Sequence, residues 1–192
     1  MRIMVVDDEP IIRMDLREIL EEYGYTVICE ASDGVTAVNL ARSFRPTVTL
    51  MDIKMPGEID GLDAAKVIIE EEICPVVMLT AYNQQELVEE ASAVGVYGYL
   101  VKPIKENDVY PTINVAVANW EMLKKLKEEN DCLKDKLEKR KIIDIAKGIL
   151  MEKYNMKEKE AYRKMQKLSM QNRKEMAEIA KSIIINNQLM NL

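Results

Sequence analysis

The sequence predicts an α/β fold for the first part of the chain, a doubly wound parallel sheet of five strands, and helices alone for the remainder. Three observations support this. Five short apolar runs alternate with helical patterns of about ten or more residues, which is typical of parallel strands joined by right-handed crossovers. The runs are continuously apolar, as expected for strands that helices cover on both faces. After residue 112 the sequence shows only helical patterns.

The strands and the first helix have recognisable start and stop signals. The strands are expected at residues 2–6, 26–29, 47–51, 76–79 and 97–101. Pro10 suits the first turn of a helix, and Gly24 follows the end of that helix. The apolar face of this first helix is expected to contain Ile11, Ile12, Met14, Leu16, Ile19 and Leu20.

The other helices of this part follow in the same way. Ser32 and Asp33 are capping residues for the second helix, and Pro46 closes that unit. A third helix is expected at 62–72 and a fourth at 83–94, where Gly95 ends it. Each helix returns the chain to the start of the next parallel strand.

Polar side chains stand at the ends of four of these strands. Asp7 and Asp8 follow the first strand, Asp52 the third, Thr80 the fourth and Lys102 the fifth. Because the carboxyl ends of parallel strands meet at one edge of a sheet, we expect these side chains to converge. Each alone has an ordinary explanation, since aspartates often end strands and Lys-Pro is a common turn. Together they indicate a site.

Three carboxylates at one edge repel one another unless a cation lies among them. Their hard oxygen atoms favour Mg²⁺, or Mn²⁺, with several waters retained. A metal ion beside a hydroxyl and an ammonium group would neutralise the oxygens of a phosphoryl group. Asp52, already ionised at neutral pH, would then attack in line without a base.

These residues also carry a family resemblance. Residues 1 to about 120 resemble the receiver domain of two-component response regulators, through Asp7-Asp8, Asp52 with Met55-Pro56, Asp60-Gly61, Thr80-Ala81 and Lys102-Pro103. The resemblance implies a flavodoxin-like fold. It also implies that a sensor histidine kinase phosphorylates Asp52. A receiver assists only its own phosphorylation and dephosphorylation, so no independent enzyme is expected.

The resemblance further implies roles for single residues. Asp8, Asp52 and the Lys54 carbonyl would ligate the metal, with Asp7 acting through water. Thr80 and Tyr99 would form a switch pair, in which Thr80 moves toward the phosphoryl group and Tyr99 rotates inward. The loop of residues 57–60 is one residue longer than usual in the family, which leaves its path open.

The next segment is a long helix without Gly or Pro from Thr112 to about Arg140. Within it, a and d positions of a heptad repeat are occupied by Leu123, Leu126, Asn130, Leu133 and Leu137. An Asn at an a position is typical of a parallel dimeric coiled coil. The alternative is a single amphipathic helix packed on its own chain. Two heptads are short for a dimer, so it would need a second interface.

Three helices are expected after residue 140, at about 142–153, 158–170 and 173–185. This part of the chain resembles the ANTAR domain of antitermination regulators, a three-helix module that binds RNA, through Arg140, Ala146-Lys147-Gly148-Ile149-Leu150-Met151, Ala161-Tyr162 and Met176-Ala177-Glu178-Ile179-Ala180. Gly148 costs about 1 kcal/mol relative to Ala inside a helix, which indicates close approach by another surface. Tyr162 is either a stacking platform or a core residue. The candidate RNA-binding residues are Arg140, Lys147, Gly148, Tyr162, Arg163, Arg173 and Lys174.

Charge supports two modules with different partners. Residues 1–120 hold 9 Lys and Arg against 21 Asp and Glu, a net charge of −12, whereas residues 121–192 hold 18 against 12, a net of +6. A basic module suits a polyanion, although a solvated helical surface would look the same. With no His and three scattered Cys, a zinc site, a disulfide framework and a His-assisted nucleophile are excluded. Membrane-span and signal-peptide patterns are absent, so a cytoplasmic protein is expected.

These observations together predict a receiver domain at 1–119, a coiled-coil linker at 120–139 and an ANTAR domain at 140–192. The favoured function is a response regulator whose phosphorylation on Asp52 drives homodimerisation and the binding of RNA hairpins in nascent transcript leaders, so that termination is prevented. A phosphorylation-controlled DNA-binding transcription factor is the alternative, although no clear helix-turn-helix pair is visible. A basic module that binds a protein partner is the third hypothesis.

Overall fold

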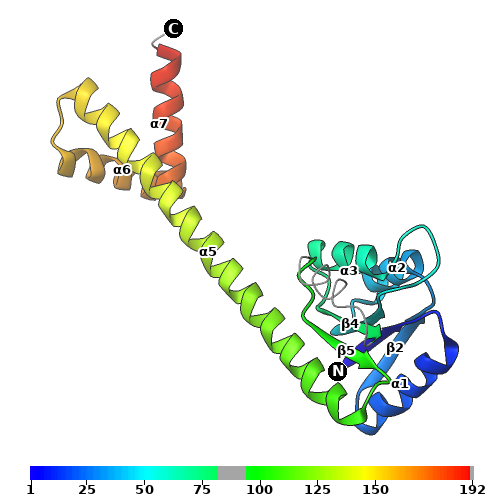
Figure 1. Cartoon of the computed structure of the whole chain (residues 1–192). Coiled ribbons are helices and arrows are strands. Elements are labelled where there is room, and N and C mark those ends of the chain that lie inside the picture. Colours follow the sequence, from blue (N-terminus) through cyan, green and yellow to red (C-terminus); the bar gives the residue numbers. More distant parts are fainter. Residues whose placement is uncertain (82–93, 191–192) are drawn as a thin grey trace. The chain divides into compact units, whose positions relative to one another are not determined.

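A computed structural model describes residues 1–81 and 94–190 of the chain (Figure 1). The chain divides into two compact units, Met1–Lys124 and Lys125–Leu192. The helix predicted at 83–94 falls, except for its last residue, outside the described residues. No helix of the described part is both long and apolar enough to span a membrane.

The first unit contains the predicted parallel sheet. Its strands are β1 (Arg2–Val6), β2 (Thr26–Ala31), β3 (Val48–Asp52), β4 (Val76–Ala81) and β5 (Gly98–Lys102). All four pairings are parallel, and the strand order is β2-β1-β3-β4-β5. The flavodoxin-like fold is therefore confirmed. In this order, the chain changes direction across the sheet between β1 and β3, and ligands of such sheets bind outside the carboxyl ends of the strands at this point.

Helices cover both faces of the sheet, which explains why the strands are apolar throughout (Figure 1). On one face Met4 and Val6 of β1 pack with α2 (Gly34–Phe44) and α3 (Gly61–Glu70). On the other face Ile3 and Val5 pack with α1 (Pro10–Glu22) and the first turns of α5 (Glu106–Tyr154). Successive residues of a strand point to opposite faces, so β1 contributes to both cores.

Two details of α1 and α2 test the predicted helix signals. Asp33 is the N-cap of α2, as predicted, and its carboxylate accepts a hydrogen bond from the Thr36 N–H at 2.8 Å. In α1 the prediction was wrong for Ile11 and Met14, which are 61% and 55% exposed. The buried face of α1 consists of residues spaced three or four apart, such as Leu16 and Leu20. Ile11 and Met14 lie outside this face.

The cysteines differ sharply in environment, and this gives a labelling prediction. Cys74 is 1% exposed, and burial raises the pKa of its thiol to about 11, whereas Cys132 is exposed as predicted. Because the thiolate is the reactive form, a maleimide at neutral pH is expected to modify Cys132 in the native chain and Cys74 only after unfolding. Peptide mass spectrometry over time measures this, and Cys132→Ser should remove the fast phase. Equal rates at both thiols would contradict the packing around Cys74.

The second unit begins within α5, which runs unbroken through residue 140 to Tyr154. It continues with α6 (Glu158–Asn172) and α7 (Met176–Met190). The three helices share a small core of Ala146, Leu150, Ala161, Met165 and Ala180. Three of these five side chains are those of Ala, which allows the helices to approach closely.

The start of α7 corrects one predicted boundary. The third helix was expected from about Arg173, but α7 begins at Met176. Arg173 adopts the left-handed conformation, with φ of 53°, and is the C-cap of α6. A residue in this conformation ends a helix, and hence Arg173 belongs to the turn between α6 and α7.

The predicted coiled-coil positions are exposed in the single chain. Leu123, Leu126, Leu133 and Leu137 are 54%, 50%, 61% and 59% exposed, and Asn130 is also exposed. A stripe of leucines at heptad spacing that remains half exposed is unusual for a helix packed on its own chain. However, exposure within each unit does not separate the two alternatives, and the dimeric coiled coil stays a prediction.

Candidate functional site

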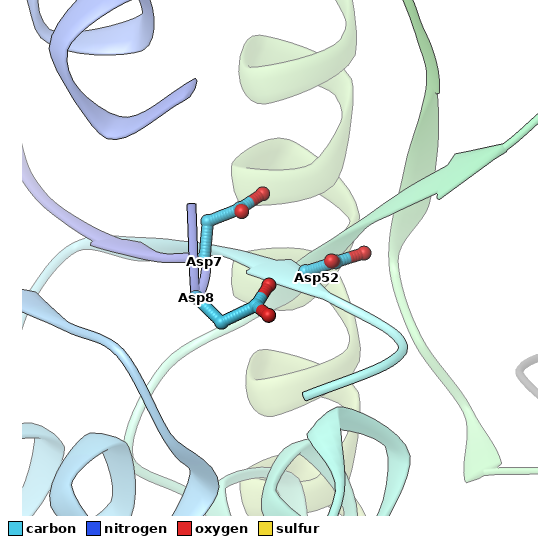
Figure 2. Close-up of side chains that lie close together, drawn as sticks. All are labelled: Asp7, Asp8 and Asp52. Atoms are coloured by element: carbon cyan, nitrogen blue, oxygen red, sulfur yellow. The ribbon is translucent and has the colours of Figure 1, made fainter. Parts of the chain in front are cut away.

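The carboxyl ends of β1 and β3 bring three carboxylates together. Asp7 and Asp8 follow β1 directly, and Asp52 is the last residue of β3, the neighbouring strand. One oxygen atom from each of the three lies within 4.8 Å of the others, and Figure 2 shows the three side chains close together. The sequence predicted this convergence.

Asp7 is the buried member of the cluster. Its side chain is fully buried, and its Oδ1 atom accepts a hydrogen bond from the Glu9 N–H at 3.0 Å. The Oδ2 atom lies 2.7 Å from Lys102 Nζ but makes no hydrogen bond of good geometry. A buried carboxylate oxygen with spare acceptor capacity suits a metal-bound water or a cation, and the all-oxygen donor set matches Mg²⁺.

Lys102 connects the two strands. Its Nζ atom is 2.7 Å from Asp7 Oδ2 and 3.0 Å from Asp52 Oδ2. Burial alone would lower the pKa of Lys102, but its close contacts with the two carboxylates outweigh burial and raise the pKa above its ordinary value. Lys102 therefore remains charged and can neutralise an anion bound at this edge.

The pKa of Asp52 is raised above its ordinary value. Burial is the largest cause and the charge of Asp7 adds to it, while Lys102 acts in the opposite direction. Burial and the neighbouring Asp7 carboxylate thus disfavour negative charge on Asp52. A divalent cation among the three carboxylates would reverse this effect and favour the ionised form of Asp52.

The two predicted switch residues lie on neighbouring strands, β4 and β5. Thr80 is buried, and its hydroxyl donates a hydrogen bond to the Ala81 carbonyl at 3.2 Å. Tyr99 is 52% exposed on β5, beside Met78 of β4 in the register of the sheet. Thr80 would have to give up its bond to Ala81 to donate to a phosphoryl group.

Glycines position the segment that leads away from Asp52. A Cβ atom on Gly61, the first residue of α3, would stand 1.7 Å from the Asp52 carbonyl oxygen. A Cβ atom on Gly34 would stand 2.7 Å from the Ile59 carbonyl oxygen. The path of the 57–60 loop, which the sequence left open, therefore runs against the start of α2, and Gly57 turns it with φ of 135°.

The candidate RNA-binding residues fall into two groups. Arg140, Tyr162, Arg163, Arg173 and Lys174 are exposed, with Tyr162 at 43%. Tyr162 is thus a surface residue of the single chain. Gly148 borders a surface hollow, and a Cβ atom there would meet nothing within 4 Å, so the close approach expected from its position is not made by the described part of this chain.

Lys147 is the exception, because its ammonium group already forms ion pairs with two carboxylates. Its Nζ atom lies 2.8 Å from Asp144 Oδ1 and 2.8 Å from Glu158 Oε1, and its side chain is only 16% exposed. The hydrogen bond from Lys147 lowers the pKa of Asp144. Sequence reasoning missed this pairing. Asp144 stands three residues earlier on the same helix and could have been noticed, but the contact with Glu158 requires the packing of α6 on α5.

Comparisons with known proteins agree with both parts of the chain. Residues 3–114 match the family model of the response regulator receiver domain, and residues 131–184 match the model of the ANTAR domain. The chain is similar to the transcriptional regulatory protein PdtaR of Mycobacterium tuberculosis, with 41% identity over 95% of this chain and 89% of that protein.

Other similar proteins match the first unit alone. The chemotaxis protein CheY of Thermotoga maritima is 35% identical over 59% of this chain and 94% of its own length. Among solved structures, the response regulator domain of Thermotoga maritima CheB has a TM-score of 0.57 at 28% identity, covering 62% of this chain and 96% of that domain.

Proposed function

Because the chain belongs to the response regulators that join a receiver domain to an ANTAR domain, we propose that phosphorylation of Asp52 controls dimerisation and RNA binding, and so prevents transcription termination. The observation that supports this most is the cluster of Asp7, Asp8 and Asp52 bridged by Lys102, in a chain that also carries an ANTAR module. The division into a receiver at 1–119, a linker at 120–139 and an ANTAR domain at 140–192 is part of the proposal.

In the proposed phosphorylation step, a carboxylate oxygen atom of Asp52 attacks phosphorus in line, while the bond from phosphorus to the kinase histidine breaks and the imidazole leaves. Mg²⁺ supplies positive charge that offsets the charge of the phosphoryl oxygens when it is bound. Asp8, Asp52 and the Lys54 carbonyl would hold the metal, and Asp7 would act through water. Lys102 releases its contact with Asp52 Oδ2 to pair with the phosphoryl group, and Thr80 exchanges its bond to Ala81 for the same group.

The donor is a sensor histidine kinase, and the chain itself catalyses nothing beyond its own phosphorylation and dephosphorylation. The output is a change in oligomeric state. Tyr99, now 52% exposed, turns inward behind Thr80 when the phosphoryl group is present. Phosphorylation can only bias arrangements that already exist, so it must favour the receiver conformation that pairs with a second copy.

The exposed leucines are the proposed dimer interface. Leu123, Leu126, Leu133 and Leu137 would pack with the same residues of a second copy, and Asn130 would fix a parallel, in-register pair. Two heptads give too little burial for a dimer by themselves. A contribution from phosphorylated receivers would therefore decide whether the ANTAR modules are paired.

A paired set of ANTAR modules would hold two neighbouring hairpin loops in a nascent transcript. Exposed Tyr162 can stack on an unpaired base, and Arg140, Arg163, Arg173 and Lys174 can bind phosphates. Stabilising those hairpins excludes the competing terminator hairpin. With a nascent transcript as the target, the protein acts in the cytoplasm.

A binding experiment with the full-length chain tests the proposal. The chain is mixed with a pool of transcript-leader RNAs, duplex DNA is the competitor, and samples are run with and without a small phosphodonor plus Mg²⁺. Donor-enhanced capture of leaders that contain paired hairpins is the expected result. Capture of duplex DNA would support the transcription-factor alternative instead, and capture of RNA regardless of the donor would overturn the control by Asp52.

The contact between Lys147 and Glu158 gives a prediction of its own. Glu158→Gln is expected to raise RNA affinity about 3-fold, because a phosphate no longer competes with a carboxylate for Lys147. Fluorescence anisotropy with a labelled hairpin at fixed salt measures the effect. Glu152→Gln is the matched control, since Glu152 is exposed and makes no ion pair in the part of the chain that the structure describes. An equal gain in RNA affinity in both variants would mean that the effect comes from net charge alone. A loss of affinity in Glu158→Gln would show that the contact with Lys147 serves only the fold.

A further inference from the structure

The short connection between β1 and α1 contains Asp7 and Asp8, and two hydrogen bonds hold its main chain at Asp7. The Asp7 N–H donates to the Ala31 carbonyl of β2 at 3.2 Å. The Asp7 carbonyl accepts a hydrogen bond from Nη1 of Arg13 at 2.7 Å. The first bond is part of the sheet, whereas the second comes from a side chain on α1.

Arg13 is itself held from the other side. Only 18% of its side chain is exposed, and its Nε atom donates to Oε2 of Glu30 at 3.3 Å. Glu30 lies on β2, opposite Val5 of β1. The guanidinium group therefore links β2 to the segment between β1 and α1, which carries Asp7 and Asp8. Arg17, one turn further along α1, also donates to Glu30 but has no contact with Asp7 among the described residues.

The position of this hydrogen bond affects both acids. The Asp7 carbonyl belongs to the peptide group that joins Asp7 to Asp8, and this group is planar from one Cα atom to the next. Holding its oxygen atom holds this plane, and so restricts ψ of Asp7 and φ of Asp8, the two torsions that set the directions of their Cα–Cβ bonds relative to the plane. We propose that Arg13 is a positioning residue for the metal site, which acts through the Asp7–Asp8 peptide and touches neither metal nor phosphoryl group. The inference rests on the proposed function only in requiring a divalent cation among the carboxylates.

Arginine is suited to this role for a geometric reason. The planar guanidinium offers Nε to Glu30 and Nη1 to the Asp7 carbonyl at the same time, in a fixed relative orientation. Glu30, which Arg17 also contacts, offsets part of the charge of Arg13 and so reduces its repulsion toward a cation bound nearby. A lysine could reach either acceptor but could not hold both in one rigid plane.

Magnesium titration of three full-length proteins tests the proposal. Isothermal titration calorimetry with MgCl₂ is carried out on the wild type, Arg13→Gln and Arg17→Gln. Both variants lose an ion pair with Glu30, so both are expected to melt at a lower temperature. Only Arg13→Gln should lose Mg²⁺ affinity, by about 10-fold, the size of effect seen when a residue that supports a metal ligand is removed. Arg17→Gln should stay within about 2-fold of the wild type.

Further outcomes separate this inference from the proposed function. Arg13→Lys should recover part of the affinity, since a lysine can still donate to the Asp7 carbonyl. Wild-type affinity in Arg13→Gln, or an equal loss in both Gln variants, would overturn the positioning role. If the wild type binds Mg²⁺ and Arg13→Gln weakens it, but no phosphodonor modifies Asp52, the inference stands and the proposed function fails. A wild type that binds no Mg²⁺ would overturn both.

Discussion

Replacing Asp52 by Asn is expected to reduce phosphoryl incorporation from a small phosphodonor by more than about 100-fold, because the nucleophile is lost. Neither of the two other carboxylates in the cluster, Asp7 and Asp8, is placed to substitute. Asp7 is buried with one oxygen bound to the Glu9 N–H and the other in contact with Lys102, and Asp8 is proposed to hold the metal. Intact-protein mass spectrometry in the presence of Mg²⁺ measures incorporation.

Asp33→Asn is the matched control for this experiment. It makes the same chemical change at the N-cap of α2, where Asn caps as well as Asp, and it should leave incorporation unchanged. The donor-dependent increase in RNA capture should disappear in Asp52→Asn and persist in Asp33→Asn. Incorporation at wild-type level in Asp52→Asn would show that another residue accepts the phosphoryl group.

A stability measurement separates lost chemistry from lost folding in the same variant. Three carboxylates within 4.8 Å repel one another, and burial already raises the pKa of Asp52. Without a metal, Asp52→Asn should therefore melt at a higher temperature than the wild type. A lower melting temperature would mean that the variant is damaged, and its loss of incorporation could not then be assigned to the nucleophile.

Gly61→Ala is expected to destabilise the first unit by about 3 kcal/mol or more. Its Cβ atom would stand 1.7 Å from the Asp52 carbonyl oxygen, 2.9 Å from the Asp52 carbonyl carbon and 3.0 Å from the Ile53 carbonyl oxygen. All three are backbone atoms at the end of a central strand, so none can turn aside as a flexible side chain would. Urea unfolding followed by circular dichroism gives the free energy, and phosphoryl incorporation should fall as well because Asp52 moves.

Gly148→Ala is the paired control for this variant. Gly148 also lies in a helix, but a Cβ atom there meets nothing within 4 Å, so helix propensity alone should stabilise the second unit by about 1 kcal/mol. The change in the free energy of unfolding is therefore expected to have opposite signs in Gly61→Ala and Gly148→Ala. A change of less than about 1 kcal/mol in Gly61→Ala would show that α3 can shift away from β3 at little cost.

Much of the fold and of the acid cluster was predictable from the sequence, since both depend on local patterns and one topological rule. Runs such as Ile3–Val6 are apolar at every position, which indicates burial on both faces and hence a parallel sheet with helices on both sides. Once the strands are parallel, residues that follow them must meet at one edge. Asp7, Asp8, Asp52 and Lys102 therefore converge whatever the details of packing.

Only the tertiary structure decided which partners these residues have. Arg13 reaches the Asp7 carbonyl because Glu30, on another strand, directs its guanidinium group. Lys147 is paired because α6 places Glu158 beside it. The angle at which one helix packs on another sets such contacts, and no periodicity within a single segment encodes that angle. Sequence by itself determined the fold and the residue types at the site, and packing between distant segments determined their contacts and their freedom to react.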